Sequence, residues 1–153
     1  MRTAIVLLAV LALTGCSATE PAPTLSSADA IERYQPVFDE VSAAVEKAYP
    51  GHEYTLDNEH DLVDTSPCII WIGDLENRTT DADDRYDYIA LIAPFIEDAG
   101  FDDFRELDPV EGAPSMPTFI AEDDLGTQAS VTFDYPGFSF AIVANVVDDP
   151  CEP

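Results

Sequence analysis

Apolar residues recur at steps of three and four between residues 37 and 49, the period of one face of an α-helix. The stripe consists of Val37, Phe38, Val41, Ala44, Val45, Ala48 and Tyr49. Ser26 or Ser27 is suited to cap the N-terminus of such a helix, and Pro50 followed by glycine ends it. The pattern predicts a helix between these points, which Pro36 either kinks or divides into a first turn and a regular part.

A second stripe at helical spacing lies between residues 81 and 99. Its members are Tyr88, Leu91, Ile92, Phe95, Ile96 and Ala99. Thr80 or Asp81 can cap its N-terminus, and Gly100 is suited to the C-terminal cap. We therefore expect a second helix over residues 81–99, kinked at Pro94.

Residues 68–72 read Cys-Ile-Ile-Trp-Ile between Pro67 and Gly73. Such a run of β-branched and apolar residues predicts a strand that is buried on both faces, followed by a loop over residues 74–80. On this interpretation Trp71 belongs to the core, and a stacking platform for a sugar is the alternative.

The C-terminal third of the chain has the pattern of strands. They are expected over residues 118–122, 127–134 and 138–147, with a turn before Gly126 and a Pro-Gly turn after Tyr135. The last run is apolar on both sides over much of its length and should be central in a sheet. Residues 53–56 and 101–107 are suited to further short strands.

The order of these elements predicts an α+β fold, an antiparallel sheet of about four to six strands with two helices packed on one face. The chain of 153 residues is long enough for one such domain and short for two.

The first residues have a different pattern. Arg2 is followed by an apolar run from Ala4 to Leu13 and then by small residues, which is the layout of a secretory signal peptide. The run is too short to span a bilayer, which takes about 20 apolar residues. Residues 17–27 are small and polar with two prolines, which predicts an extended tether.

Leu13-Thr14-Gly15-Cys16 resembles the lipobox of bacterial lipoproteins. In that family the thiol at the position of Cys16 receives a diacylglycerol and the amine is often acylated too, so the resemblance implies a lipid anchor on the extracytoplasmic side of the cell membrane. Residues 1–15 would be the signal peptide, 16–27 the lipidated cysteine and tether, and 28–153 one domain. The alternative is an ordinary secretory peptide with an incidental cysteine after its cut site.

The chain is strongly acidic, with 31 Asp and Glu against six Lys and Arg. Removal of Arg2 with the signal leaves five basic residues and a formal charge of 5 − 31 = −26. Such a surface repels phosphate backbones, so nucleic-acid binding is excluded. A cation-seeking surface and adaptation to salt are both compatible with this charge, but we favour a soluble exported domain that resists non-specific association.

Cys68 and Cys151 are the cysteines left when Cys16 carries lipid. An even number in an exported domain favours a disulfide between them, and free thiols or a metal site are the alternatives. Closing a loop of about 80 residues removes roughly 4.5 kcal/mol of denatured-state freedom in the chain-entropy model.

Several short sequences elsewhere in the chain extend the resemblance that begins with the lipobox. Ser-Pro-Cys-Ile-Ile-Trp at residues 66–71, Ala-Gly-Phe at 99–101 and Asp-Pro-Cys at 149–151 together resemble small cell-envelope lipoproteins of actinobacteria, the LppA-like kind. The resemblance implies an α+β domain with an internal disulfide. Such families are largely without assigned activity, so no catalytic residue carries over.

Residues for catalysis are few. A hydrolase needs a nucleophile, a base and an orienting group in reach of one another, and the usual bases are limited to His52 and His60, both in a polar segment. We interpret them as surface histidines and expect no catalytic residues and no enzymatic activity.

Calcium is the cofactor best suited to the acidic segments, because it takes several oxygen ligands. Asp81, Asp83 and Asp84 are the candidate ligands before the second predicted helix, and residues 122–124 form another acidic segment. Neither matches the spacing of an EF-hand loop. A solvated acidic cap on the helix is the alternative, and we expect no resident cofactor.

Tyr135 and Phe138 flank the last predicted turn, where an exposed aromatic pair could bind a partner or instead cover the end of the core. Together these features predict a monomeric, membrane-anchored, non-enzymatic binding module whose partner is an envelope protein or a wall component. A ligand or calcium carrier is the alternative, and a hydrolase ranks last.

Overall fold

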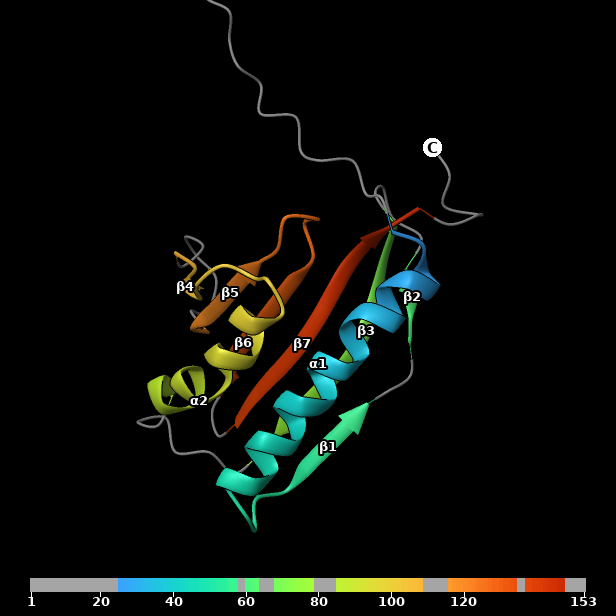
Figure 1. The fold of residues 1–153 in the computed structure, drawn as a ribbon. Helices are drawn as coiled ribbons and strands as arrows, with labels where there is room; N and C mark the ends of the chain where they lie inside the picture. The colour runs from blue at the N-terminus through green and yellow to red at the C-terminus, as the bar shows by residue number, and fades with distance from the viewer. Residues whose placement is uncertain are drawn as a thin grey trace, which may run out of the picture.

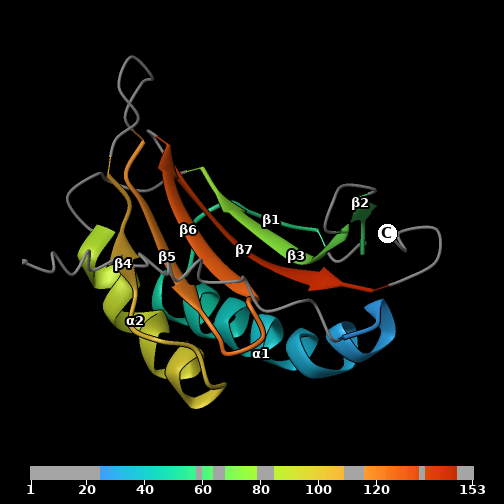
Figure 2. The same cartoon turned by 90° about the horizontal axis from the view of Figure 1, so that it is seen from above.

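A computed structural model describes residues 25–57, 60–63, 68–78, 85–108, 116–134 and 137–147. These residues form an antiparallel sheet with two helices on one of its faces (Figures 1 and 2). The predicted α+β class is confirmed. Among the described residues, no helix is both long enough and apolar enough to cross a bilayer.

Helix α1 spans Ser27–Ala48 and continues through Pro36 without interruption. The Ser26 side chain caps it by accepting a hydrogen bond from the backbone N–H of Asp29 at 3.1 Å. The face of α1 that meets the sheet is fully buried and consists of Ala30, Tyr34, Phe38, Val41 and Val45.

Helix α2 is described over Arg85–Asp98, and the predicted start at residues 81–84 lies outside the described residues. Gly100 ends it with a positive φ of 95°, where a side chain would be strained. The Phe101 N–H donates to the carbonyl of Ile96 at 3.2 Å, which satisfies one of the last carbonyls of the helix.

Seven strands make one sheet in the order β1-β3-β7-β6-β5-β4, with β2 paired to β3 beside β1. Their bounds are β1 Tyr54–Asp57, β2 Leu62–Val63, β3 Cys68–Asn77, β4 Arg105–Glu106, β5 Thr118–Glu122, β6 Gln128–Asp134 and β7 Gly137–Val146. Strand β7 lies in the interior of the sheet, as its apolar pattern predicted. The count exceeds the prediction because β2 has two residues, too few for a sequence pattern, whereas β4 lies within residues 101–107, where a short strand was expected.

Strand β3 is longer than predicted because Gly73 lies within it. The pairing of β3 with β7 shifts between Trp71 and Gly73, which is the mark of a β-bulge. Ile72 is fully buried at this point. Residues 74–77, which we expected in a loop, therefore continue the strand.

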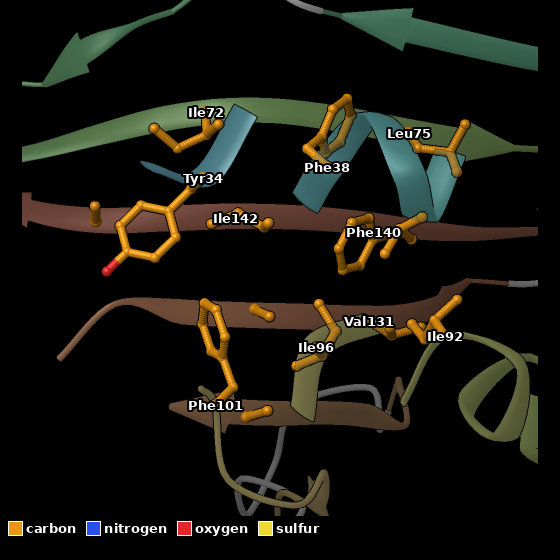
Figure 3. Close-up of a cluster of buried hydrophobic side chains, with 14 of the residues drawn as sticks. Tyr34, Phe38, Ile72, Leu75, Ile92, Ile96, Phe101, Val131, Phe140 and Ile142 are labelled. Carbon is orange, nitrogen blue, oxygen red and sulfur yellow. The ribbon is translucent and has the colours of Figure 1, made fainter. Parts of the chain in front are cut away.

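The core fills the space between the helices and the sheet (Figure 3). Phe38 of α1 stacks on Phe140 of β7 with ring centroids 5.8 Å apart. Near the other end of the same layer, Tyr34 meets Phe101 edge-on at 5.8 Å. These contacts fix α1 across the middle of the sheet, and no helix of the described residues lies on the opposite face (Figure 2).

Candidate functional site

The sheet face opposite the helices is the candidate binding surface. Residues directly opposite one another on neighbouring strands point to the same side, so the register identifies this face. Trp71 on β3 pairs with Val143 on β7, which in turn pairs with Gln128 on β6. Trp71 is 38% exposed. The prediction that its strand is buried on both faces was wrong, because both helices pack on the same side.

One end of this face is apolar. Val63 on β2 pairs with Ile69 on β3, two residues before Trp71, and Val147 continues the alternation of β7 beyond Val143. Val63 and Val147 are 36% and 45% exposed. We call this surface the Trp71 patch, made of Val63, Ile69, Trp71, Val143 and Val147, with the polar Asn145 opposite Ile69.

The described chain begins beside the Trp71 patch. Leu25 forms a parallel bridge with Val146, and the Val147 N–H donates to the Leu25 carbonyl at 2.9 Å. Leu25, β2 and the C-terminal end of β7 thus lie at one end of the sheet (Figure 1). The N-terminal segment joins the domain at the same end as the patch.

The same sheet face is acidic toward its other end. Asp57 on β1 pairs with Asp74 on β3, and Glu76 follows on the same side two residues later. Burial raises the pKa of Asp74, and the nearby carboxylates of Glu76 and Asp57 raise it further. Among the described residues, Asp74 Oδ1 is buried without a hydrogen-bond partner. The open face therefore combines an apolar end with an acidic end.

Asp123, in the second acidic segment, holds the turn between β5 and β6 to helix α1. Its carboxyl group accepts a hydrogen bond from the Tyr34 hydroxyl and, at 2.9 Å each, from the N–H groups of Leu125 and Thr127. The Thr127 hydroxyl donates to Tyr34 at 2.9 Å. Burial raises the pKa of Tyr34 to about 12, and the hydrogen bond to Asp123 contributes. These contacts indicate a structural role for Asp123.

The candidate calcium ligands Asp81, Asp83 and Asp84 lie outside the described residues. Within the ranges that the structure describes, no group of three His, Cys, Asp or Glu side chains is placed to hold a metal ion.

The two histidines are paired with neutral side chains. His52 Nδ1 lies 3.0 Å from Asn77 Nδ2 and 3.4 Å from the Tyr88 hydroxyl. His60 Nε2 lies 2.7 Å from Gln35 Oε1. These partners are amides and a phenol, whereas a general base is usually oriented by a carboxylate. The sequence did not predict these hydrogen-bond partners of the histidines, because Gln35, Asn77 and Tyr88 belong to three separate elements.

Of the predicted partner-binding pair, Tyr135 lies outside the described residues. Phe138 is only 4% exposed, and its ring lies 4.2 Å from that of Tyr88. Phe138 thus covers the end of the core, which was the alternative interpretation, and is not available as a surface anchor.

Cys68 is disulfide-bonded and 1% exposed. Cys16 and Cys151 both lie outside the described residues, so the partner of Cys68 and the lipidation of Cys16 stay predictions. Cys68 pairs in register with Val146, five residues before Cys151 in the sequence.

Over the part of the chain that the structure describes, the fold is an α+β domain with helices on one face of the sheet and none on the other. A similar fold occurs in the crystal structure of a DUF4853 family protein from Actinomyces odontolyticus ATCC 17982, with a TM-score of 0.59 and 11% sequence identity over 88% of this chain and 77% of that chain. At this identity the similarity concerns the fold alone. No protein-family model matches the chain, and no curated protein matches it.

Proposed function

We propose that this protein is a lipid-anchored, extracytoplasmic and non-enzymatic binding module of the cell envelope, with the open sheet face as its binding surface. The observation that carries the proposal is Leu13-Thr14-Gly15-Cys16 directly after an apolar run of signal-peptide length. Acyl chains at Cys16 would hold the mature chain at the membrane, since two or more chains give lasting attachment.

The Trp71 patch supports a binding role for the open face. Side chains of Val63, Trp71 and Val147 expose apolar surface in one region of a strongly acidic protein. Contiguous exposed apolar surface rimmed by polar residues is typical of interaction sites. Tryptophan is also one of the side chains enriched at hot spots, the few interface residues that contribute most of the binding energy.

Processing at Cys16 is tested by mass spectrometry of the protein purified from a bacterium that lipidates it. The mature chain should begin at Cys16 and carry two or three acyl chains. Cys16→Ser should lack them and should not fractionate with membranes as a mature protein. A native protein with an intact Met1, or a processed terminus without fatty acid, contradicts the proposal.

Binding is tested by cross-linking the anchored protein in envelope preparations and comparing two aromatic variants. Trp71→Ala should lose components that the wild type retains, because it removes the centre of the patch. Tyr86→Ala is the matched control, since Tyr86 is 60% exposed on α2. Equal retention of every component by both variants would argue against the open face as the binding surface.

A calcium carrier is the second candidate function. No described group of three side chains is placed to hold a metal ion, but Asp74 has a buried oxygen without a hydrogen-bond partner close to Asp57 and Glu76. Calorimetric titration of the calcium-free protein distinguishes the two. Heat of binding and a higher melting temperature with calcium, both lost in Asp74→Asn, would support a carrier. The triple variant Asp81→Asn, Asp83→Asn, Asp84→Asn is the comparison. If it removes the heat of binding and the rise in melting temperature while Asp74→Asn leaves both unchanged, the calcium site lies before α2.

A further inference from the structure

We propose that the Trp71 patch rests on the interfacial region of the bilayer that holds the lipid of Cys16, so that the lipid and the patch together orient the domain. This inference rests on the proposed function and names the partner of one end of its binding surface. It is carried by the position of the patch, by the length of the tether and by the distribution of charge.

The tether keeps the patch close to the membrane. Nine peptide steps separate Cys16 from Leu25, which limits the distance between them to about 32 Å when the chain is fully extended. Leu25 contacts Val146 and Val147 directly. The patch end of the domain is therefore within reach of the headgroups, whereas the acidic end of the sheet is farther along β3.

The composition of the patch suits a lipid interface. Tryptophan is enriched where membranes meet water, because its ring is apolar and its N–H can remain hydrated. Ile69, Val143 and the exposed Val63 and Val147 add aliphatic surface around it. Asn145 is the polar residue among them, and its side-chain amide donates to the Gly126 carbonyl at 3.2 Å. Tethering raises the effective concentration of the patch at the bilayer to the millimolar range, so weak intrinsic affinity is sufficient.

The charges on the open face favour the same orientation. Asp57, Asp74 and Glu76 lie toward the end remote from Leu25. Glu76 is five residues from Trp71 along β3, which is roughly 15 Å and more than the Debye length of about 10 Å at 0.1 M salt. Among the described residues, Asp61 lies beside the patch, where its backbone carbonyl accepts a hydrogen bond from the backbone N–H of Trp71 at 3.0 Å. Contact should therefore be weaker on anionic vesicles at low salt than on neutral ones.

Trp71 is the only tryptophan in the chain, so its fluorescence reports on the patch directly. The lipidated full-length mature protein is reconstituted into phosphatidylcholine vesicles with or without bromine on the acyl carbons near the headgroup. Brominated lipid should quench Trp71 emission, and acrylamide should quench it less than in the Cys16→Ser protein free in solution. Quenching should diminish when anionic lipid is added at low salt and return at high salt.

Two double variants provide a matched comparison. Val63→Asp with Val147→Asp puts two charges in the patch, whereas Leu107→Asp with Met116→Asp puts two charges on exposed apolar residues next to β4 and β5, at the opposite edge of the sheet. Both proteins should fold by circular dichroism and float with vesicles. The patch variant should lose bromine quenching and the control should keep it.

The outcomes separate the two proposals. Protein that floats with vesicles but shows no bromine quenching overturns the membrane contact and leaves the lipid anchor intact. Protein without acyl chains at Cys16 overturns both. Trp71 emission that is shielded only after envelope extract is added, without bromine quenching, assigns the patch to a protein or wall partner and overturns the membrane contact.

Discussion

Gly73 of β3 leaves the space that the ring of Phe38 occupies. A Cβ atom on Gly73 would lie 2.6 Å from Phe38 Cε1 and 2.8 Å from Cδ1, closer than side-chain carbons approach in proteins. The same ring stacks on Phe140 with an angle of 9° between the planes. The bulge in β3, the missing side chain and the phenylalanine together set how closely α1 approaches the sheet.

Gly73→Ala should destabilise the domain by about 1–3 kcal/mol, the usual cost of overpacking a core. The measurement is the free energy of unfolding from denaturant titration. Phe38→Leu shortens the side chain and costs stability by itself, but it should cost less when Gly73→Ala is already present. A double-mutant cycle with additive losses would contradict the contact.

Tyr34→Phe should lower the free energy of unfolding by about 1–3 kcal/mol. The change removes the hydroxyl that donates to Asp123 and accepts from Thr127, and leaves polar groups in the interior with fewer partners. Tyr86→Phe is the control, because it removes a hydroxyl group from a side chain that is 60% exposed. This substitution should change the free energy of unfolding by less than about 0.5 kcal/mol. Equal effects of the two substitutions would argue against the buried hydrogen bonds.

Asp74→Asn should raise the melting temperature at neutral pH. Because the folded-state pKa of Asp74 is raised, ionisation of its carboxyl group costs stability. The cost is absent below the unfolded-state pKa, grows as the pH rises between the two pKa values and is complete above the folded-state pKa. The amide of Asp74→Asn carries no charge. The difference in melting temperature between the variant and the wild type should therefore shrink as the pH falls toward the ordinary pKa of an aspartic acid. Melting curves at several pH values check this; a constant advantage at all pH values would refute it.

Cys68→Ser and Cys151→Ser should each cost up to roughly 4.5 kcal/mol under oxidising conditions, because both remove the predicted bond that closes a loop of about 80 residues. The two losses should be equal and should vanish in reductant. Cys16→Ser should leave stability unchanged. Peptide mapping without reduction identifies the pair, and a linkage of Cys68 to Cys16 would contradict both the pairing and the lipid anchor.

Local patterns predicted much of the fold. The helical stripes, the Ser26 cap, the Gly100 end of α2 and the interior place of β7 all follow from short-range periodicity and capping, and each is confirmed. The continuation of β3 beyond Gly73 was missed. A glycine that accommodates Phe38 in a bulge has the same sequence signature as a glycine that ends a strand.

The sequence by itself determined the class of fold, the acidity and the lipobox, because each depends on residues adjacent in the chain or on composition alone. Tertiary structure decided that Trp71 is exposed, that Phe138 is buried and that Asp123 anchors a turn to α1. The physical reason is that residues 68–72 are apolar at every position, so the run has no alternation from which the covered face could be identified. Coverage depends on where the helices pack, and that is set by contacts between residues far apart in the sequence.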